Sequence, residues 1–134
     1  MPQSLVILNV ASIKPWEVEY TDEFEEWWNS LTENEQSEVQ ASVKLLSALG
    51  PGLKFPHSSG ITQSKHSRMR ELRTQCEGRP LRTLYAFDPR RVAILLISGD
   101  KTGNDRRYDE FVPKADRIYD QHLQELQEKE ESDG

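Results

Sequence analysis

Residues 68–108 read RMRELRTQCEGRPLRTLYAFDPRRVAILLISGDKTGNDRRY. Three runs in this stretch, at 69–73, 81–87 and 92–98, have the composition of β-strands and are separated by short, turn-like segments. Short connections favour pairing between consecutive strands, so we expect a three-stranded antiparallel meander. The third run is apolar on both faces, which predicts a central strand that is covered on both sides.

The residues before this stretch predict one strand and a first helix. Apolar and acidic residues alternate over 16–20, which is the pattern of a half-buried strand. Thr21 or Asp22 is a suitable N-cap for the helix that follows. We expect Trp27 and Trp28 of this helix to be core anchors.

A second helix is predicted directly after the first. Thr32 and Glu35 have the spacing of a capping box, and the Gly-Pro-Gly sequence at 50–52 ends the helix. Its apolar face contains Val39, Val43, Leu46 and, as further candidates, Leu45 and Leu49. The two helices are expected to form an antiparallel hairpin that packs against the sheet.

The remaining segments complete an α+β domain. Residues 52–65 are predicted to be a loop that Phe55 and Ile61 fix to the core, and a final helix is predicted to follow Pro113. The apolar side of that helix contains Ala115, Ile118, Tyr119, His122, Leu123 and Leu126. We expect an N-terminal extension at 1–14, one folded domain at 15–129 and a disordered tail at 130–134.

Length and composition limit the function classes. The chain has 134 residues, which is the size of one domain, and its one cysteine, Cys76, excludes a disulfide framework and a cysteine-rich metal cluster. The apolar segment near the start is too short to span a bilayer and lacks a basic flank. We therefore expect a cytoplasmic protein that does not act at a membrane.

The charge is distributed unevenly along the chain. The net charge of −6 combines −7 for residues 1–50, +7 for residues 51–107 and −6 for residues 108–134. A basic middle between acidic flanks suggests an anionic partner for the middle. The alternative is an ordinary mixed surface without such a partner.

Several cations of the basic middle can converge on one site. Arg82 lies in the middle of a predicted strand, where burial is costly, so it either pairs with a carboxylate such as Glu71 or faces a groove. Four further residues follow the third strand: Lys101, Arg106, Arg107 and Tyr108. Arginine and lysine side chains bind RNA phosphates, and a tyrosine can stack on a base.

Such a set can cleave RNA without a metal or another cofactor, and we expect none. A lysine takes the 2′-hydroxyl proton, arginines stabilise the charge on the phosphorane, and an acid protonates the departing 5′-oxygen. No phosphate-binding loop or dinucleotide fingerprint competes with this interpretation. The histidines at 57, 66 and 122 lack metal-ligand spacing, and Cys76 has no recognisable base partner.

The ordered runs MRELR, RTLYAFDPRR, VAILLISGDKTG and YDEFVPKADRIYDQHLQEL resemble the phage-derived Gp49-like, or HigB-like, branch of the RelE/ParE toxin superfamily. The resemblance extends back to VEYTDEFEEWWNSL and covers roughly residues 16–127. It implies a RelE-like fold: an N-terminal strand, a two-helix hairpin, a three-stranded antiparallel meander in the same sheet and a C-terminal helix.

The same resemblance implies a function and a partner. It indicates the toxin of a type II toxin–antitoxin system, a ribosome-dependent mRNA endoribonuclease. The expected partner is a cognate antitoxin with a helix-turn-helix domain, similar to HigA. Two alternatives remain: a ParE-type toxin that inhibits a protein such as DNA gyrase, and a catalytically degenerate member that only binds its antitoxin.

The resemblance also implies the catalytic residues. The second-strand arginine of the family matches Arg82, the basic residue after the last strand matches Lys101, and the tyrosine towards the C-terminus matches Tyr108. The lysines that RelE-type enzymes carry on the preceding strand are not reproduced, and arginine is a poor general base. The expected phosphate-binding residues are Arg68, Arg70, Arg73, Arg106 and Arg107.

Overall fold

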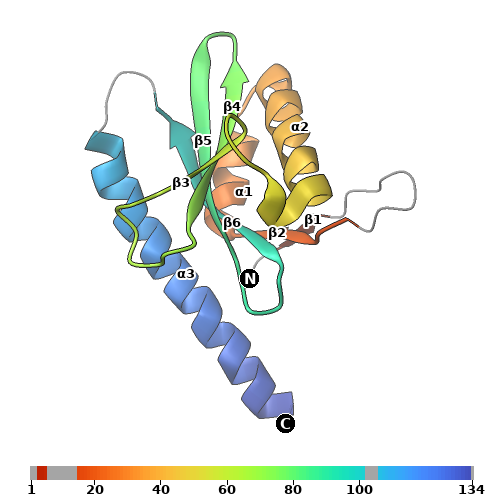
Figure 1. Cartoon of the computed structure of the whole chain (residues 1–134), viewed down its shortest axis with the longest axis vertical. Helices are drawn as coiled ribbons and strands as arrows, with labels where there is room; N and C mark the ends of the chain where they lie inside the picture. Colours follow the sequence, from red (N-terminus) through yellow and green to blue (C-terminus); the bar gives the residue numbers. More distant parts are fainter. Residues whose placement is uncertain (1–2, 6–14, 102–105, 134) are drawn as a thin grey trace.

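The computed structural model describes residues 3–5, 15–101 and 106–133, and it has an α+β fold (Figure 1). The elements in chain order are β1 (Gln3–Leu5), β2 (Val18–Tyr20), α1 (Asp22–Asn29), α2 (Glu33–Leu49), the 3₁₀ turn η1 (Gly50–Gly52), β3 (Ser58–Gly60), β4 (Arg70–Cys76), β5 (Arg79–Phe87), β6 (Ala93–Asp100) and α3 (Arg106–Asp133). This is the predicted RelE-like order of strand, helical hairpin, meander and C-terminal helix.

The strands form one sheet in the order β1-β2-β6-β5-β4-β3. The β4, β5 and β6 strands pair as the predicted antiparallel meander, and β2 joins β6 in parallel. Two further short strands complete the sheet. The β3 strand lies inside the segment expected to be a loop and pairs with β4, while β1 lies inside the expected N-terminal extension and pairs with β2.

Helices cover both faces of the sheet (Figure 1). The α1–α2 hairpin packs on one face in a cluster that includes Phe24, Val39 and Leu46. The α3 helix packs on the other face in a cluster that includes Val112 and Tyr119. Because β6 supplies residues to both clusters, the prediction of a central strand covered on both sides is confirmed.

The starts of the two hairpin helices were correctly predicted. The Thr21 hydroxyl accepts a hydrogen bond from the Phe24 amide, and Thr32 and Glu35 form the complete capping box of α2. Val39, Val43 and Leu46 are buried as expected, whereas Leu45 and Leu49 are exposed. The side chains of Trp27 and Trp28 are partly buried against the core, beside Phe24.

The predicted start of the final helix was wrong. The α3 helix begins at Arg106, and Pro113 lies inside it. The proline is exposed, so its ring faces away from the sheet, while Val112 and Ala115 beside it are buried. Burial of these neighbours outweighs the loss of one helical hydrogen bond at the proline.

The C-terminal part of α3 extends beyond the sheet (Figure 1) and continues to Asp133, through most of the segment expected to be a tail. In the part of the chain that the structure describes, no helix combines the length and the apolar character needed to cross a membrane.

A buried carboxylate at the β5–β6 turn connects three parts of the fold. Asp88 accepts hydrogen bonds from the Arg90 and Val92 amides and from His122 Nε2 of α3, at 2.9, 3.3 and 2.9 Å. The Arg90 guanidinium pairs with Asp88 at 2.7 Å and with Glu19 of β2 at 2.8 Å. One side chain therefore ties the turn to α3 and, through Arg90, to β2.

Neutralising this carboxylate is expected to destabilise the protein. Burial by itself raises the pKa of Asp88, but hydrogen bonds from His122, Arg90 and Val92 outweigh burial and hold the pKa below its ordinary value. The contribution of the carboxylate to stability is therefore complete above about pH 4 and is lost as the pH falls through the folded-state pKa. Asp88→Asn should lower the free energy of unfolding by about 3 kcal/mol at neutral pH.

Urea unfolding of the wild type and of Asp88→Asn over a series of pH values measures this contribution. The difference between the two proteins should narrow below about pH 4. Glu130→Gln, which removes an exposed carboxylate of α3, is the control and should change stability by less than about 0.5 kcal/mol. If the difference in unfolding free energy between the two proteins were the same at acidic and at neutral pH, the stabilising role of the Asp88 carboxylate would be wrong.

A glycine allows α3 to approach β6 closely. A Cβ atom added at Gly99 would overlap with the ring of Phe111, whereas one added at Gly52 would have nothing within 4 Å. Gly99→Ala should therefore lower the free energy of unfolding by about 1–3 kcal/mol, because the Phe111 ring must move. Thermal unfolding of Gly99→Ala and of the control Gly52→Ala tests this expectation, and equal melting temperatures would rule out the close contact.

Candidate functional site

Arg82 and Lys101 lie beside one another at the end of the sheet where α3 begins. Arg82 is on β5, and Lys101 follows the last residue of β6, with its amide donating to the Pro80 carbonyl at 2.8 Å. Both side chains line a cavity of about 10 Å³. The other residues of this lining are Leu84, Ile97, Gly99, Asp100 and Phe111. Two residues that are distant in sequence thus share one small cavity.

Arg82 also belongs to a cluster with the buried Glu71 and the partly buried Arg73. Arg82 and Arg73 are directly opposite each other in the β4–β5 pair. One oxygen of Glu71 accepts hydrogen bonds from Arg73 Nη1 at 3.0 Å and from Ser59 Oγ at 2.7 Å, and it lies 4.0 Å from Arg82 Nε. The two options for Arg82, pairing with Glu71 and facing a groove, are therefore both realised.

The polar atoms of this cluster are incompletely paired. Arg82 is 9% exposed, and its Nη1 donates to the Leu81 carbonyl at 3.0 Å. The Arg82 Nε and the second oxygen of Glu71 are buried without a hydrogen-bond partner. A buried donor without a hydrogen-bond partner destabilises the protein. Such unpaired donors are found at sites that bind a ligand.

Burial and the nearby Arg73 lower the pKa of the Arg82 guanidinium, and Glu71 partly offsets them. Arginine nevertheless remains protonated in proteins. Two positive charges are thus held close together with one carboxylate between them. The arrangement favours an additional anion at Arg82.

The other residues expected to bind phosphate are in different positions. Arg70 is on β4, one residue from Glu71, so it points to the opposite face, where its Nε donates to Ser58 Oγ at 2.9 Å. Arg68 is exposed just before β4. Arg106, Arg107 and Tyr108 form the start of α3, and their side chains lie outside the described part of the structure.

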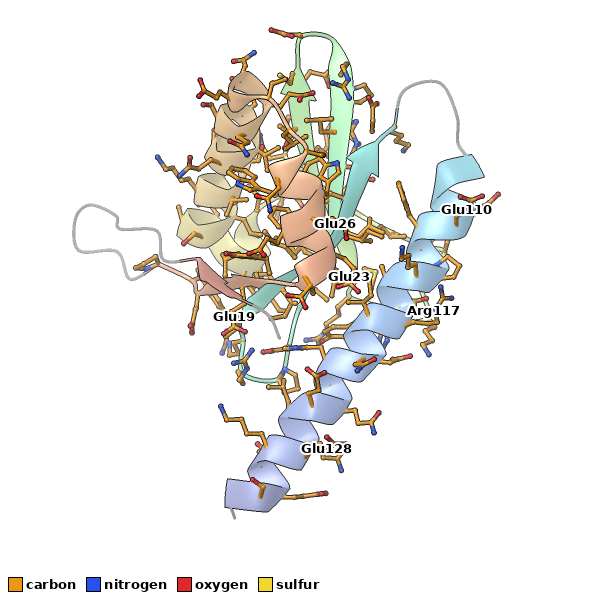
Figure 2. All side chains as sticks on the ribbon, turned by 180° about the vertical axis from the view of Figure 1, so that it is seen from behind. Glu19, Glu23, Glu26, Glu110, Arg117 and Glu128 are labelled. Carbon is orange, nitrogen blue, oxygen red and sulfur yellow. The ribbon has the colours of Figure 1, made fainter. Side chains whose placement is uncertain are left out.

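Three cations of the basic middle pair with carboxylates of the acidic flanks, and two of them also pair with a carboxylate of the middle itself. Arg79 pairs with Glu35 and Asp100, Arg90 pairs with Glu19 and Asp88, and Lys65 pairs with Asp120. Exposed carboxylates are distributed along α1 and α3, including Glu23, Glu26, Glu110 and Glu128 (Figure 2). These pairs offset part of the positive charge that the sequence concentrates in residues 51–107.

Other reactive side chains have structural partners. His66 and His122 contact Asp120 and Asp88, respectively, through Nε2. Cys76 is buried, and burial raises the pKa of its thiol, which disfavours a role as nucleophile. No cluster of metal-binding side chains is found among the residues that the structure describes.

A second cavity, of about 410 Å³, lies between the sheet and α2. Arg82 lines this cavity as well, so the two cavities adjoin at its side chain. The other lining residues are Glu38, Ala41, Ser42, Leu45, Pro56, His57, Arg73, Thr74 and Gln75. His57 was not predicted to lie here, because its loop segment has no periodic pattern from which its position could be inferred.

Comparisons with known proteins place the chain in a family. Residues 26–120 match the family described as Phage derived protein Gp49-like. The chain is 36% identical over 104 residues to "Putative toxin HigB2" of Mycobacterium tuberculosis, covering 76% of this chain and 52% of the relative. It is 40% identical over 94 residues to "Putative toxin HigB3" of the same organism, covering 69% of this chain and 81% of the relative.

The match to the first of these relatives thus spans only about half of its length. No solved structure matches the chain. The family match, which covers well over half of the residues, and the two HigB-type relatives lead to one conclusion: the chain belongs to the phage-derived Gp49-like family and is a HigB-like member of it.

Proposed function

We propose that this chain is the toxin of a type II toxin–antitoxin pair and that it cleaves mRNA on the ribosome in the cytoplasm. The names of its relatives support the toxin role. The observation that carries the nuclease role is the position of Arg82. Its buried Nε has no hydrogen-bond partner, and its side chain shares a cavity with Lys101.

The proposed reaction uses the 2′-hydroxyl of the RNA as nucleophile. Its oxygen bonds to the adjacent phosphorus, its proton passes to a base, and the bond from phosphorus to the 5′-oxygen breaks as an acid supplies that oxygen with a proton. We assign the role of base to Lys101, because its side chain shares the cavity with Arg82. Arg82, supported by Arg73, stabilises the additional negative charge on the phosphorane.

The first turn of α3 is part of the proposed site. The contact between Phe111 and Gly99 brings this end of the helix close to Lys101. Tyr108 lies less than one helical turn before Phe111, and we assign it to stacking on a base of the substrate. Arg106 and Arg107 are assigned to phosphate contacts.

The proposed partner is a cognate antitoxin with a HigA-like helix-turn-helix domain. Co-production of this partner should abolish growth arrest by the toxin. An antitoxin that binds over Arg82 and Lys101 would block RNA directly, whereas one that binds elsewhere would prevent entry into the ribosome.

Mapping mRNA 5′ ends after induced expression without antitoxin tests the nuclease activity. The wild type should arrest growth and generate cuts in phase with codons. Lys101→Ala should reduce cleavage by about 10²–10⁴-fold through loss of the base, and Arg82→Ala by about 10²–10³-fold through loss of charge stabilisation. The exposed residues Lys129 and Arg117 on α3 provide matched controls, and Lys129→Ala and Arg117→Ala should cleave like the wild type.

Because Arg82 is buried, its variants need a folding control. Thermal unfolding of Arg82→Lys, which keeps the charge, separates loss of chemistry from loss of fold. Undiminished cleavage in both Arg82→Ala and Lys101→Ala would overturn the site assignment. SOS induction and filamentation without mRNA cuts would indicate a gyrase-type target instead, and absence of toxicity would indicate a degenerate member.

A further inference from the structure

An aromatic side chain that was expected in the core is on the surface. Phe55, predicted to fix the 52–65 loop, is 70% exposed, whereas Ile61 in the same loop is buried as expected. Among the described residues, the large hydrophobic side chains on the surface are Leu45, Leu49 and Phe55, and Phe55 is the most exposed of them. Exposing this ring to water is unfavourable, so Phe55 is a candidate for contact with a ligand.

The Phe55 ring is held in place by the arginine cluster of the candidate site. The Arg73 guanidinium carbon lies 5.1 Å from the ring centroid, in a cation–π contact. Arg73 also bonds to Glu71, and its amide donates to the His57 carbonyl at 2.9 Å. With one face of the ring against Arg73, its high exposure leaves the opposite face open to solvent.

The larger cavity begins next to this ring. Its lining includes Pro56 and His57, which follow Phe55 directly, and it also includes Arg73 and Arg82. Its volume of about 410 Å³ falls within the usual range of small-molecule pockets, roughly 300–1,000 Å³. Arg73 therefore lies against the Phe55 ring and lines the same cavity as Arg82, the arginine proposed to bind phosphate.

We propose that Phe55 and this cavity form a binding site for an unpaired RNA base, adjacent to the phosphate that Arg82 binds. This inference rests on the proposed nuclease function. A base stacks on the open face of Phe55 while its own phosphate remains near the two arginines. The carboxylate of Glu38 and the amide of Gln75 in the same lining supply hydrogen-bonding groups for the edge of a base.

A protein partner is the competing occupant of an exposed phenylalanine. The cavity is lined by Arg73 and Arg82, with Glu71 between them, and by the carboxylate of Glu38. We choose RNA because two arginines beside an aromatic ring suit a phosphate and its base. Stacking on an aromatic ring beside paired arginines is a recurring way to bind single-stranded nucleic acid.

Single-turnover cleavage of a short mRNA on programmed ribosomes, measured against toxin concentration, tests the base site. Phe55→Ala and Phe55→Leu should each raise the half-saturating toxin concentration about tenfold, because both remove the stacking surface. Phe55→Trp should stay within about threefold of the wild type, since it keeps an aromatic ring. Leu49→Ala is the matched control: Leu49 is exposed and apolar but does not line the cavity, and its variant should behave like the wild type.

An mRNA that lacks one base, placed in turn at each position next to the cut, identifies the stacked base. At the sensitive position, the missing base should weaken the wild type about tenfold but should leave Phe55→Ala unchanged. If the wild type cleaves and Phe55→Ala is equally effective, the base site is wrong and the nuclease function stands. If Phe55→Ala instead loses only antitoxin binding, the surface binds protein. If the wild type does not cleave, both proposals fail.

Discussion

The hydrogen bonds to Asp88 are the interaction on which the arrangement of the layers depends. A fully buried carboxylate is costly when its oxygens are unpaired, and the partners of Asp88 come from the turn itself and from α3. Arg90 extends the network to Glu19 of β2. The network thereby joins α3, the β5–β6 hairpin and the parallel strand β2 at one point.

This network also determines where the candidate site forms. It holds the middle of α3 against the β5–β6 turn, and the close contact of Phe111 with Gly99 fixes the start of the helix at the other end of β6. Lys101 directly follows β6 and lines a small cavity together with Arg82 of the neighbouring β5 strand. The candidate site therefore lies at the end of a packed frame, which is the kind of support that the proposed chemistry would need.

Glu71 has a double role in this site. Its negative charge stabilises both Arg73 and the buried Arg82. It accepts a hydrogen bond from Arg73 but not from Arg82. Leaving the Arg82 Nε unpaired costs about 1–3 kcal/mol, a cost that a bound phosphate would offset. Because the acidic flanks neutralise other cations, RNA affinity would depend on these local contacts more than on a broad positive field.

The sequence by itself determined the features that depend on local interactions. Alternating polarity, capping residues such as Thr32 and the short turns predicted the strands of the meander, the two-helix hairpin and the order of the elements. The tertiary structure alone decided the features that depend on distant residues: the pairing of β3 with β4, the start of α3 before Pro113, and the ion pairs of three basic residues with the acidic flanks. Phe55 illustrates the physical reason, since an apolar side chain is buried only if the rest of the fold provides a place for it, and here Arg73 and the cavity beside it leave the ring at the surface.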